Sequence, residues 1–258
     1  MKVIILAGGK GTRISEESKW CPKPMVKIGE KPILWHIMKQ YSAYGFCEFV
    51  ICCGYKGYMI KEYFVHYYKH TINMDIDLGQ EKGYVFERTA EPWKVTLVDT
   101  GLETLTAGRI LRARDYIGSE PFMLTYGDGV SNVNIMQLLK FHEKQGKIAT
   151  ITVTQPEGRF GAIRLDEEKR QVQGFREKAR TDQPFVNSGF MVFQPEVFRY
   201  LSDGNSMLET LPFEGLIKAK QMAAYHHTGF WSPMDTVHDR DYLEQLWCSG
   251  KAPWRIGT

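Results

Sequence analysis

The sequence of 258 residues predicts an α/β fold built on a mixed, mostly parallel sheet that is flanked by helices. As far as residue 157, short apolar runs of strand length alternate with segments whose apolar residues recur at helical spacing. Hydrophobic residues make up 43% of the chain, which is enough for a substantial core. We therefore expect a single domain over residues 1–258.

The first strand is expected at Val3 to Leu6, because successive apolar residues are typical of a strand buried on both faces. Pro32 stands where a helix begins, and apolar residues at helical spacing follow as far as Gly45. The same patterns place further strands at 49–53, 95–99, 121–128 and 148–154, and further helices at 57–70, 107–118 and 134–146.

The pattern changes after Gly158. We expect residues 161–166, 171–178 and 188–193 to add antiparallel strands to the sheet, and a last helix to cover 237–249. The stretch from His70 to Lys94 has no clear period, and we interpret it as a flap or a subunit contact.

Composition excludes several classes of protein. The net charge is only +3, which indicates neither a nucleic-acid-binding nor a membrane surface. The five cysteines are odd in number, lack C-x-x-C spacing and are expected to be buried reduced thiols. No apolar run has the length of a signal-peptide core or a membrane span, so we expect a cytoplasmic protein.

A glycine-rich loop, "AGGKGTR", follows the first strand. It lacks the G-K-[ST] ending of a P-loop, and Ile14 stands at the third glycine of the dinucleotide-binding pattern. The loop nevertheless offers backbone N–H groups, and residues 1–27 are locally basic through Lys2, Arg13, Lys23 and three other lysines. These features favour a site for a triphosphate.

Two aspartates are candidate ligands of Mg²⁺, which prefers oxygen ligands and is usually held by one or two carboxylates together with substrate phosphates. Asp128 follows a strand, and ligands bind at the carboxyl ends of parallel strands, although Asp-Gly also forms simple turns. Asp235 precedes the last helix, where the sequence alone favours an N-cap role supported by Thr236 and Asp239.

Other polar residues are less informative by themselves. Lys178 beside Glu177 is typical of an exposed charge pair, and Asn187 is typical of a strand start. Arg109 fits the surface of its helix as well as it fits a binding role. His226 and His227 point to opposite faces of a strand, which argues against a shared metal.

The two-part pattern "LAGGKGTR" and "PKP" resembles the signature of sugar nucleotidyltransferases, the family of nucleotide-sugar pyrophosphorylases. The segments "VTLVDTG", "TYGDGV" and "GFWSPMDT" are similar to its members that make CDP-glucose, and the similarity covers nearly the whole chain. This resemblance implies a Rossmann-like nucleotidyltransferase fold and Mg²⁺-dependent transfer of CMP from CTP to glucose 1-phosphate. It also implies a homo-oligomer, a hexamer by family resemblance.

The resemblance assigns roles by motif position, and it outweighs the other interpretations of Asp235, Lys178 and Asn187. It implies catalytic roles for Arg13, Lys23, Asp128 and Asp235, with Mg²⁺ on the two aspartates. The nucleotide would lie on Leu6, Ala7, Gly8, Gly9, Gly11, Thr12, Arg13, Lys23, Thr106, Arg109 and Gly127, with Arg109 reading the base. The sugar phosphate would lie on Glu177, Lys178, Asn187 and Gly189.

Three alternatives stay open. A nucleotidyltransferase with another base or hexose phosphate would use the same phosphate-binding residues. A glycosyltransferase is disfavoured because Asp128-Gly129-Val130 is not a D-x-D pattern. A regulator that binds a nucleotide sugar without turnover would not require Arg13, Lys23, Asp128 and Asp235 together.

Overall fold

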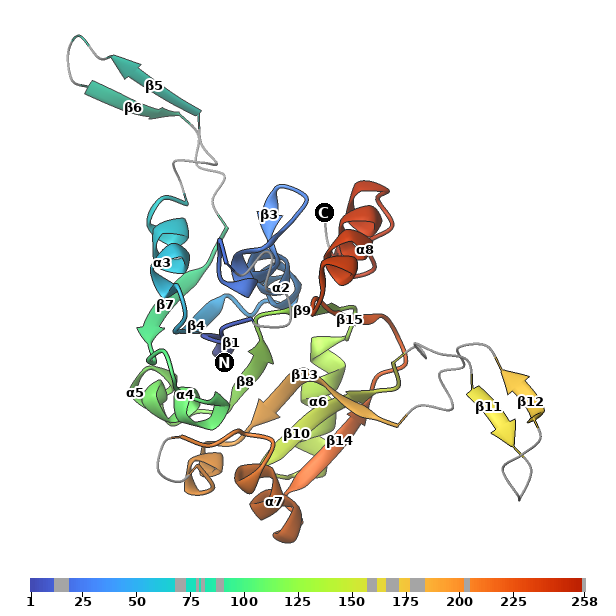
Figure 1. The fold of residues 1–258 in the computed structure, drawn as a ribbon. Helices are drawn as coiled ribbons and strands as arrows, with labels where there is room; N and C mark the ends of the chain where they lie inside the picture. The colour runs from blue at the N-terminus through green and yellow to red at the C-terminus, as the bar shows by residue number, and fades with distance from the viewer. Residues whose placement is uncertain are drawn as a thin grey trace.

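The structure is a computed structural model that describes residues 1–11, 19–67, 73–77, 79, 82–86, 91–156, 162–165, 172–176, 184–201 and 205–256. A seven-stranded sheet in the order β14-β10-β13-β8-β1-β4-β7 forms its centre (Figure 1). In that order the strands are Met222–His226, Ala149–Thr154, Val186–Phe193, Phe122–Tyr126, Val3–Ala7, Glu48–Cys53 and Lys94–Asp99.

The sheet is mixed and mostly parallel, as the sequence predicts. Strand β1 pairs in parallel with β4 and β8, β4 with β7, and β10 with β14. Only β13 runs antiparallel to its neighbours β8 and β10 within the central sheet described here. The predicted strands at 3–6 and 49–53 are confirmed, and every residue of β1 is buried, as the apolar run requires.

Helices cover both faces of the sheet (Figure 1). The side chains of β1 alternate, so that Val3 and Ile5 join a core packed with α2 and α8, whereas Ile4 and Leu6 join a second core packed with α4 and α7. The helices are α2 Ile33–Ser42, α3 Gly57–Val65, α4 Thr106–Arg112, α5 Arg114–Ile117, α6 Ile135–Gln145, α7 Leu211–Lys218 and α8 Val237–Cys248, with 3-10 turns at Lys23–Met25 and Pro195–Arg199.

Four short two-stranded ribbons complete the described structure. They are β2 (Lys27–Ile28) with β3 (Lys31–Pro32), β5 (Asn73–Asp77) with β6 (Lys82–Phe86), β9 (Gly129–Ser131) with β15 (Trp231–Pro233), and β11 (Ala162–Leu165) with β12 (Val172–Arg176). The β9–β15 ribbon matters for the site, because it brings the segment after β8 beside the segment before α8.

The prediction that residues 161–166 and 171–178 extend the central sheet is wrong. Strands β11 and β12 pair with each other, and Figure 1 shows their ribbon well away from the sheet. Both neighbouring positions of β10 are already filled, by β13 and by the parallel strand β14, which arrives from much later in the chain. The third segment, 188–193, does join the sheet as part of β13.

Two predicted helices are shorter than expected. The segment 107–118 is divided into α4 and α5 at Ala113, and α3 ends at Val65. Within 70–94 the described residues include the β5–β6 ribbon, and its role as a flap or subunit contact stays a prediction.

Among the described residues, none of the helices combines the length and the apolar character that a transmembrane span requires.

Candidate active site

The glycine-rich loop begins where β1 ends, at the carboxyl edge of the parallel strands, where α/β folds place their ligands. Gly8 is buried, whereas Gly9 and Lys10 are exposed. The carbonyl of Gly8 accepts a hydrogen bond from the Tyr55 backbone N–H at 3.1 Å. Gly11 has a φ of 63°, which is the left-handed conformation that glycine adopts at low cost. The loop thus turns tightly and presents its outer side to solvent.

Lys23 lies at the centre of a charge cluster beside this loop. It starts the 3-10 turn after Pro22, and its side chain is 8% exposed. Its Nζ donates to Oδ2 of Asp128 at 2.8 Å and to Oδ1 of Asp235 at 2.6 Å. The sequence places these three residues far apart, and the fold brings them together.

The two aspartates meet because β9 and β15 pair directly beside them. Asp128 precedes β9, Asp235 follows β15, and the Met234 N–H donates to the Asp128 carbonyl at 2.8 Å. This backbone pairing holds the main chain at Asp128 and Asp235 close together, whatever partners the side chains have.

The structure assigns the cap of α8 to Thr236 rather than to Asp235. Thr236 Oγ1 accepts from the Asp239 N–H at 3.2 Å, and the Asp239 carboxylate accepts from the Thr236 N–H at 2.8 Å, which is a capping box. The N-cap interpretation of Asp235 is therefore wrong. Its carboxylate faces Lys23 instead.

The two carboxylates fit a divalent cation. Both direct an oxygen at a single cationic atom, the Nζ of Lys23, so they face a common point. Hard oxygen ligands suit Mg²⁺, which takes its remaining ligands from phosphates and water. No cluster of three or more His, Cys, Asp or Glu side chains with metal-binding geometry occurs in the described part of the chain. A metal here would therefore depend on substrate oxygens.

A small pocket adjoins Asp128 on the side of β13. Tyr126, Asp128, Asn187 and Trp231 contribute to its lining. The Asn187 Oδ1 accepts from the Gly189 N–H at 2.9 Å. Two of the residues predicted to bind the sugar phosphate thus lie on the same strand, next to a predicted metal ligand.

Tyr126 and Glu209 form a contact that the sequence reasoning missed. The Tyr126 hydroxyl donates to Glu209 Oε1, and the Thr106 hydroxyl donates to Glu209 Oε2 at 3.1 Å. Burial, and then the Glu209 carboxylate, raise the pKa of Tyr126, so this hydroxyl stays protonated. Tyr126 lies within the segment "TYGDGV", but nothing in the sequence around Glu209 indicates that Tyr126 and Thr106 are the partners of Glu209. The Thr106 hydroxyl is turned toward residues 208–209.

Arg109, which the resemblance assigns to reading the base, lies in the interior of the protein. Its side chain points inward, the residue is 4% exposed, and both terminal nitrogens donate to protein oxygens, including the Gly8 carbonyl at 2.9 Å. Arg109 therefore lies under the glycine-rich loop, and its role in reading the base stays a prediction.

Comparison with known proteins identifies the family to which the chain belongs. The model of the family described as nucleotidyl transferase matches residues 2–243. The chain belongs to the nucleotidyl transferase family. It is 48% identical to the glucose-1-phosphate cytidylyltransferase of Salmonella typhi, over 99% of each chain. It is also 44% identical to a probable glucose-1-phosphate cytidylyltransferase of Bacillus subtilis, over 99% of this chain and 100% of that protein.

Solved structures support the nucleotidyl transferase fold. An apo UDP-glucose pyrophosphorylase matches with a TM-score of 0.69 at 19% identity, over 97% of this chain and 98% of that one. HddC from Yersinia pseudotuberculosis matches with a TM-score of 0.67 at 20% identity, over 95% and 99% of the two chains. At these identities the likeness concerns the fold alone, and it confirms the predicted fold class.

Four residues that the motifs assign to this nucleotidyl transferase site lie outside the described residues. They are Thr12, Arg13, Glu177 and Lys178. Of the other predicted residues, the structure brings Gly8, Lys23, Asp128 and Asp235 to the carboxyl edge of the sheet, together with Gly127, whose N–H donates to the Leu6 carbonyl at 3.0 Å.

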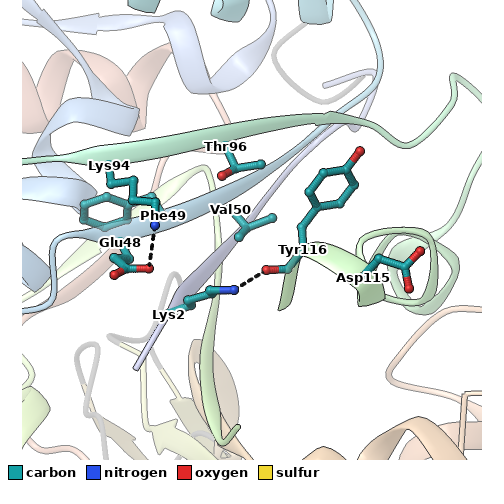
Figure 2. A pocket seen from close by; sticks show the side chains of 8 residues that line it. All are labelled: Lys2, Glu48, Phe49, Val50, Lys94, Thr96, Asp115 and Tyr116. Atoms are coloured by element: carbon teal, nitrogen blue, oxygen red, sulfur yellow. Dashed lines mark hydrogen bonds and ion pairs between the residues drawn. The ribbon is translucent and has the colours of Figure 1, made fainter. Parts of the chain in front are cut away.

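A second pocket lies at the opposite end of the strands (Figure 2). Figure 2 shows Lys2 reaching the Tyr116 carbonyl and Lys94 facing Glu48, where the ion pair measures 3.7 Å. The residues that line it include two cations and two carboxylates, so it has no excess of positive charge for a triphosphate. In a nucleotidyl transferase with parallel strands, this amino edge is not where the nucleotide binds.

Proposed function

We propose that this chain transfers CMP from CTP to α-D-glucose 1-phosphate and releases pyrophosphate. The relatives that match over their full length carry this activity in their names. The observation that supports it most directly is the cluster of Lys23, Asp128 and Asp235 beside an exposed glycine-rich loop. A lysine and two carboxylates in one place suit a substrate with several phosphates and a divalent ion.

The reaction needs no general base. A phosphate monoester has a second pKa of about 6, so glucose 1-phosphate is already mostly a dianion at neutral pH. One of its oxygens attacks the α-phosphorus of CTP and forms the new P–O bond, while the bond between the α-phosphorus and the bridging oxygen breaks and pyrophosphate leaves. The protein then contributes positioning and charge neutralisation.

The residues divide this work. The backbone of Gly8, Gly9 and Gly11 with Thr12 and Arg13 would hold the triphosphate, and Lys23 would neutralise charge that builds on the leaving pyrophosphate. Asp128 and Asp235 would hold Mg²⁺. A bound Mg²⁺ would supply positive charge that offsets the negative charge of the phosphates.

The sugar phosphate would lie on the β13 side. Lys178 would grip its phosphate, and Glu177, Asn187 and Gly189 would face the sugar. Asn187, which accepts from the Gly189 N–H, lines one small pocket together with Asp128, which is consistent with an acceptor placed next to the α-phosphorus. The proposal also includes a homo-oligomer, a hexamer by resemblance, in the cytoplasm.

The decisive experiment measures pyrophosphate release over a matrix of CTP, UTP, GTP and dTTP against several sugar 1-phosphates. We expect the highest kcat/KM for CTP with glucose 1-phosphate. A maximum at another pair would replace the base or the sugar in the proposal. Binding of nucleotide sugar without pyrophosphate release from any pair would instead identify a regulator.

A further inference from the structure

Arg109 makes five hydrogen bonds beneath the glycine-rich loop. Its Nη1 donates to Thr100 Oγ1 at 2.7 Å, to the Gly101 carbonyl at 2.8 Å and to the Cys53 carbonyl at 3.3 Å. Its Nη2 donates to the Gly8 carbonyl at 2.9 Å and to the Leu102 carbonyl at 3.4 Å. One side chain from α4 thus ties together the chain at or just beyond the ends of β1, β4 and β7.

The surrounding backbone is shaped to fit this guanidinium. A Cβ atom added to Gly8 would lie 2.0 Å from Arg109 Nη1, and one added to Gly54 would lie 2.5 Å from the same atom. Both distances are far below van der Waals contact, so both glycines are needed while Arg109 stays in place. By contrast, a Cβ on Gly9 would have no neighbour within 4 Å.

The carbonyl of Gly8 fixes the direction of the next N–H group. In a trans peptide the C=O of one residue and the N–H of the next point in opposite directions. The Gly8 carbonyl is held inward by two donors, Arg109 Nη2 and the Tyr55 N–H. The N–H of Gly9 therefore points outward, on the exposed side of the loop.

We infer that Arg109 is a positioning residue that locks the Gly8–Gly9 peptide so that the Gly9 N–H faces a phosphate of the nucleotide. This inference rests on the proposed function. All five acceptors of Arg109 are carbonyl or hydroxyl oxygens. None of these five acceptors carries a negative charge, so the positive charge of Arg109 beneath the loop also favours an anion above it.

The test separates this role from base reading by using a probe without a base. Inorganic tripolyphosphate should inhibit the wild type competitively against CTP. In Arg109→Lys, which keeps the charge and loses the planar set of donors, we expect its inhibition constant and the KM for CTP to rise about 5- to 150-fold, the range for leaving buried partners unsatisfied. The KM for glucose 1-phosphate and the CTP-to-UTP ratio of kcat/KM should stay as in the wild type.

Arg112 supplies a matched control on the same helix. Its Nη1 donates to the Thr100 carbonyl at 2.8 Å, and none of the hydrogen bonds described for its side chain reaches Gly8. Arg112→Lys should leave tripolyphosphate inhibition unchanged. A general loss of order near the end of β7 would instead weaken inhibition in both variants, and that result would overturn the inference.

A second pair of variants tests the same inference if Arg109→Lys does not fold. Gly8→Ala should abolish tripolyphosphate inhibition in the wild-type background, because its Cβ collides with Arg109 Nη1. In the Arg109→Ala background, where that atom is gone, Gly8→Ala should weaken tripolyphosphate inhibition much less. Additive effects would overturn the inference. So would a collapsed CTP-to-UTP ratio with unchanged tripolyphosphate inhibition in Arg109→Lys. A wild type that does not turn over CTP would overturn the proposed function first.

Discussion

Asp128 and Asp235 direct carboxylate oxygens at the same atom, the Nζ of Lys23, from distances of 2.8 and 2.6 Å. One ammonium thus faces two carboxylates, which leaves the cluster with a formal charge of −1. If the aspartates hold Mg²⁺ and Lys23 contacts phosphate during the reaction, the lysine must leave the carboxylates as the metal arrives. Lys23 and the metal then compete for the same oxygens.

This competition predicts an unusual effect of Lys23→Met. In the absence of nucleotide, the variant should bind Mn²⁺, a spectroscopic substitute for Mg²⁺, roughly tenfold or more tightly than the wild type, because a charge-assisted hydrogen bond no longer opposes the metal. Paramagnetic resonance titration would measure the free Mn²⁺. Lys23→Met should lower kcat more than it changes the KM values. Equal Mn²⁺ affinities in the two proteins would contradict the competition.

Asp128→Asn tests the carboxylates themselves. The side chain is 32% exposed and its amide keeps the shape of the carboxylate, so the fold should survive, as circular dichroism would show. Turnover should fall by roughly 100-fold or more, because electrostatic stabilisation of the phosphates is lost. Near-normal activity at limiting Mg²⁺ would remove Asp128 from the metal site.

The sequence predicts the central strands well and their partners poorly. Val3 to Leu6 reveal a buried strand because burial on both faces requires an apolar run, and that requirement is local. Whether residues 162–165 join the sheet depends instead on β14, which fills the place beside β10 from far along the chain. Strand pairing of this kind leaves no local pattern.

The same distinction applies to the candidate site. Asp128 and Asp235 are visible as motif residues, but their meeting at the Nζ of Lys23 depends on the β9–β15 pairing. Helical periodicity cannot say that Arg109 points inward, because that direction is set by carbonyls of three separate strand ends. Glu209 has no signal at all, since its partners Tyr126 and Thr106 come from other parts of the chain.

His36 predicts how stability depends on pH. Its Nε2 lies 2.8 Å from the Ile28 carbonyl, which can only accept, so Nε2 carries the hydrogen. Nδ1 must then accept from the Trp254 Nε1–H at 3.4 Å, which requires a neutral ring. Burial lowers the pKa of His36 to about 4, from 6.5 in an exposed chain.

The unfolded chain therefore takes up a proton between pH 6.5 and 4, while the folded protein does not. As the pH falls through this window, the free energy of unfolding should decrease by about 3 kcal/mol from this residue. Urea unfolding at several pH values would measure it. His36→Gln should reduce the dependence of the free energy of unfolding on pH, whereas replacement of the exposed His226 should leave this dependence unchanged. An unchanged slope in His36→Gln would assign the acid sensitivity to other groups.

Gly189 predicts a kinetic defect on the sugar side. Its φ is +88°, and a Cβ added there would lie 2.6 Å from Cδ2 of Tyr126. Gly189→Ala would therefore displace the Tyr126 ring and disturb Asn187, which accepts from the Gly189 N–H. We expect a higher KM for glucose 1-phosphate and a lower kcat, with a smaller change in the KM for CTP.

Gly146→Ala separates backbone strain from this contact. Gly146 ends α6 with a φ of +57°, and an added Cβ would have no neighbour within 4 Å. Alanine at positive φ should cost each variant about 1 kcal/mol of stability, and the contact with Tyr126 should add to this cost in Gly189→Ala. Only Gly189→Ala should alter the kinetics, because only its methyl group meets a side chain of the site. Steady-state measurements on both variants, with melting temperatures alongside, would decide. Equal kinetic parameters in Gly189→Ala and Gly146→Ala would show that Tyr126 and Asn187 take no part in binding the sugar phosphate.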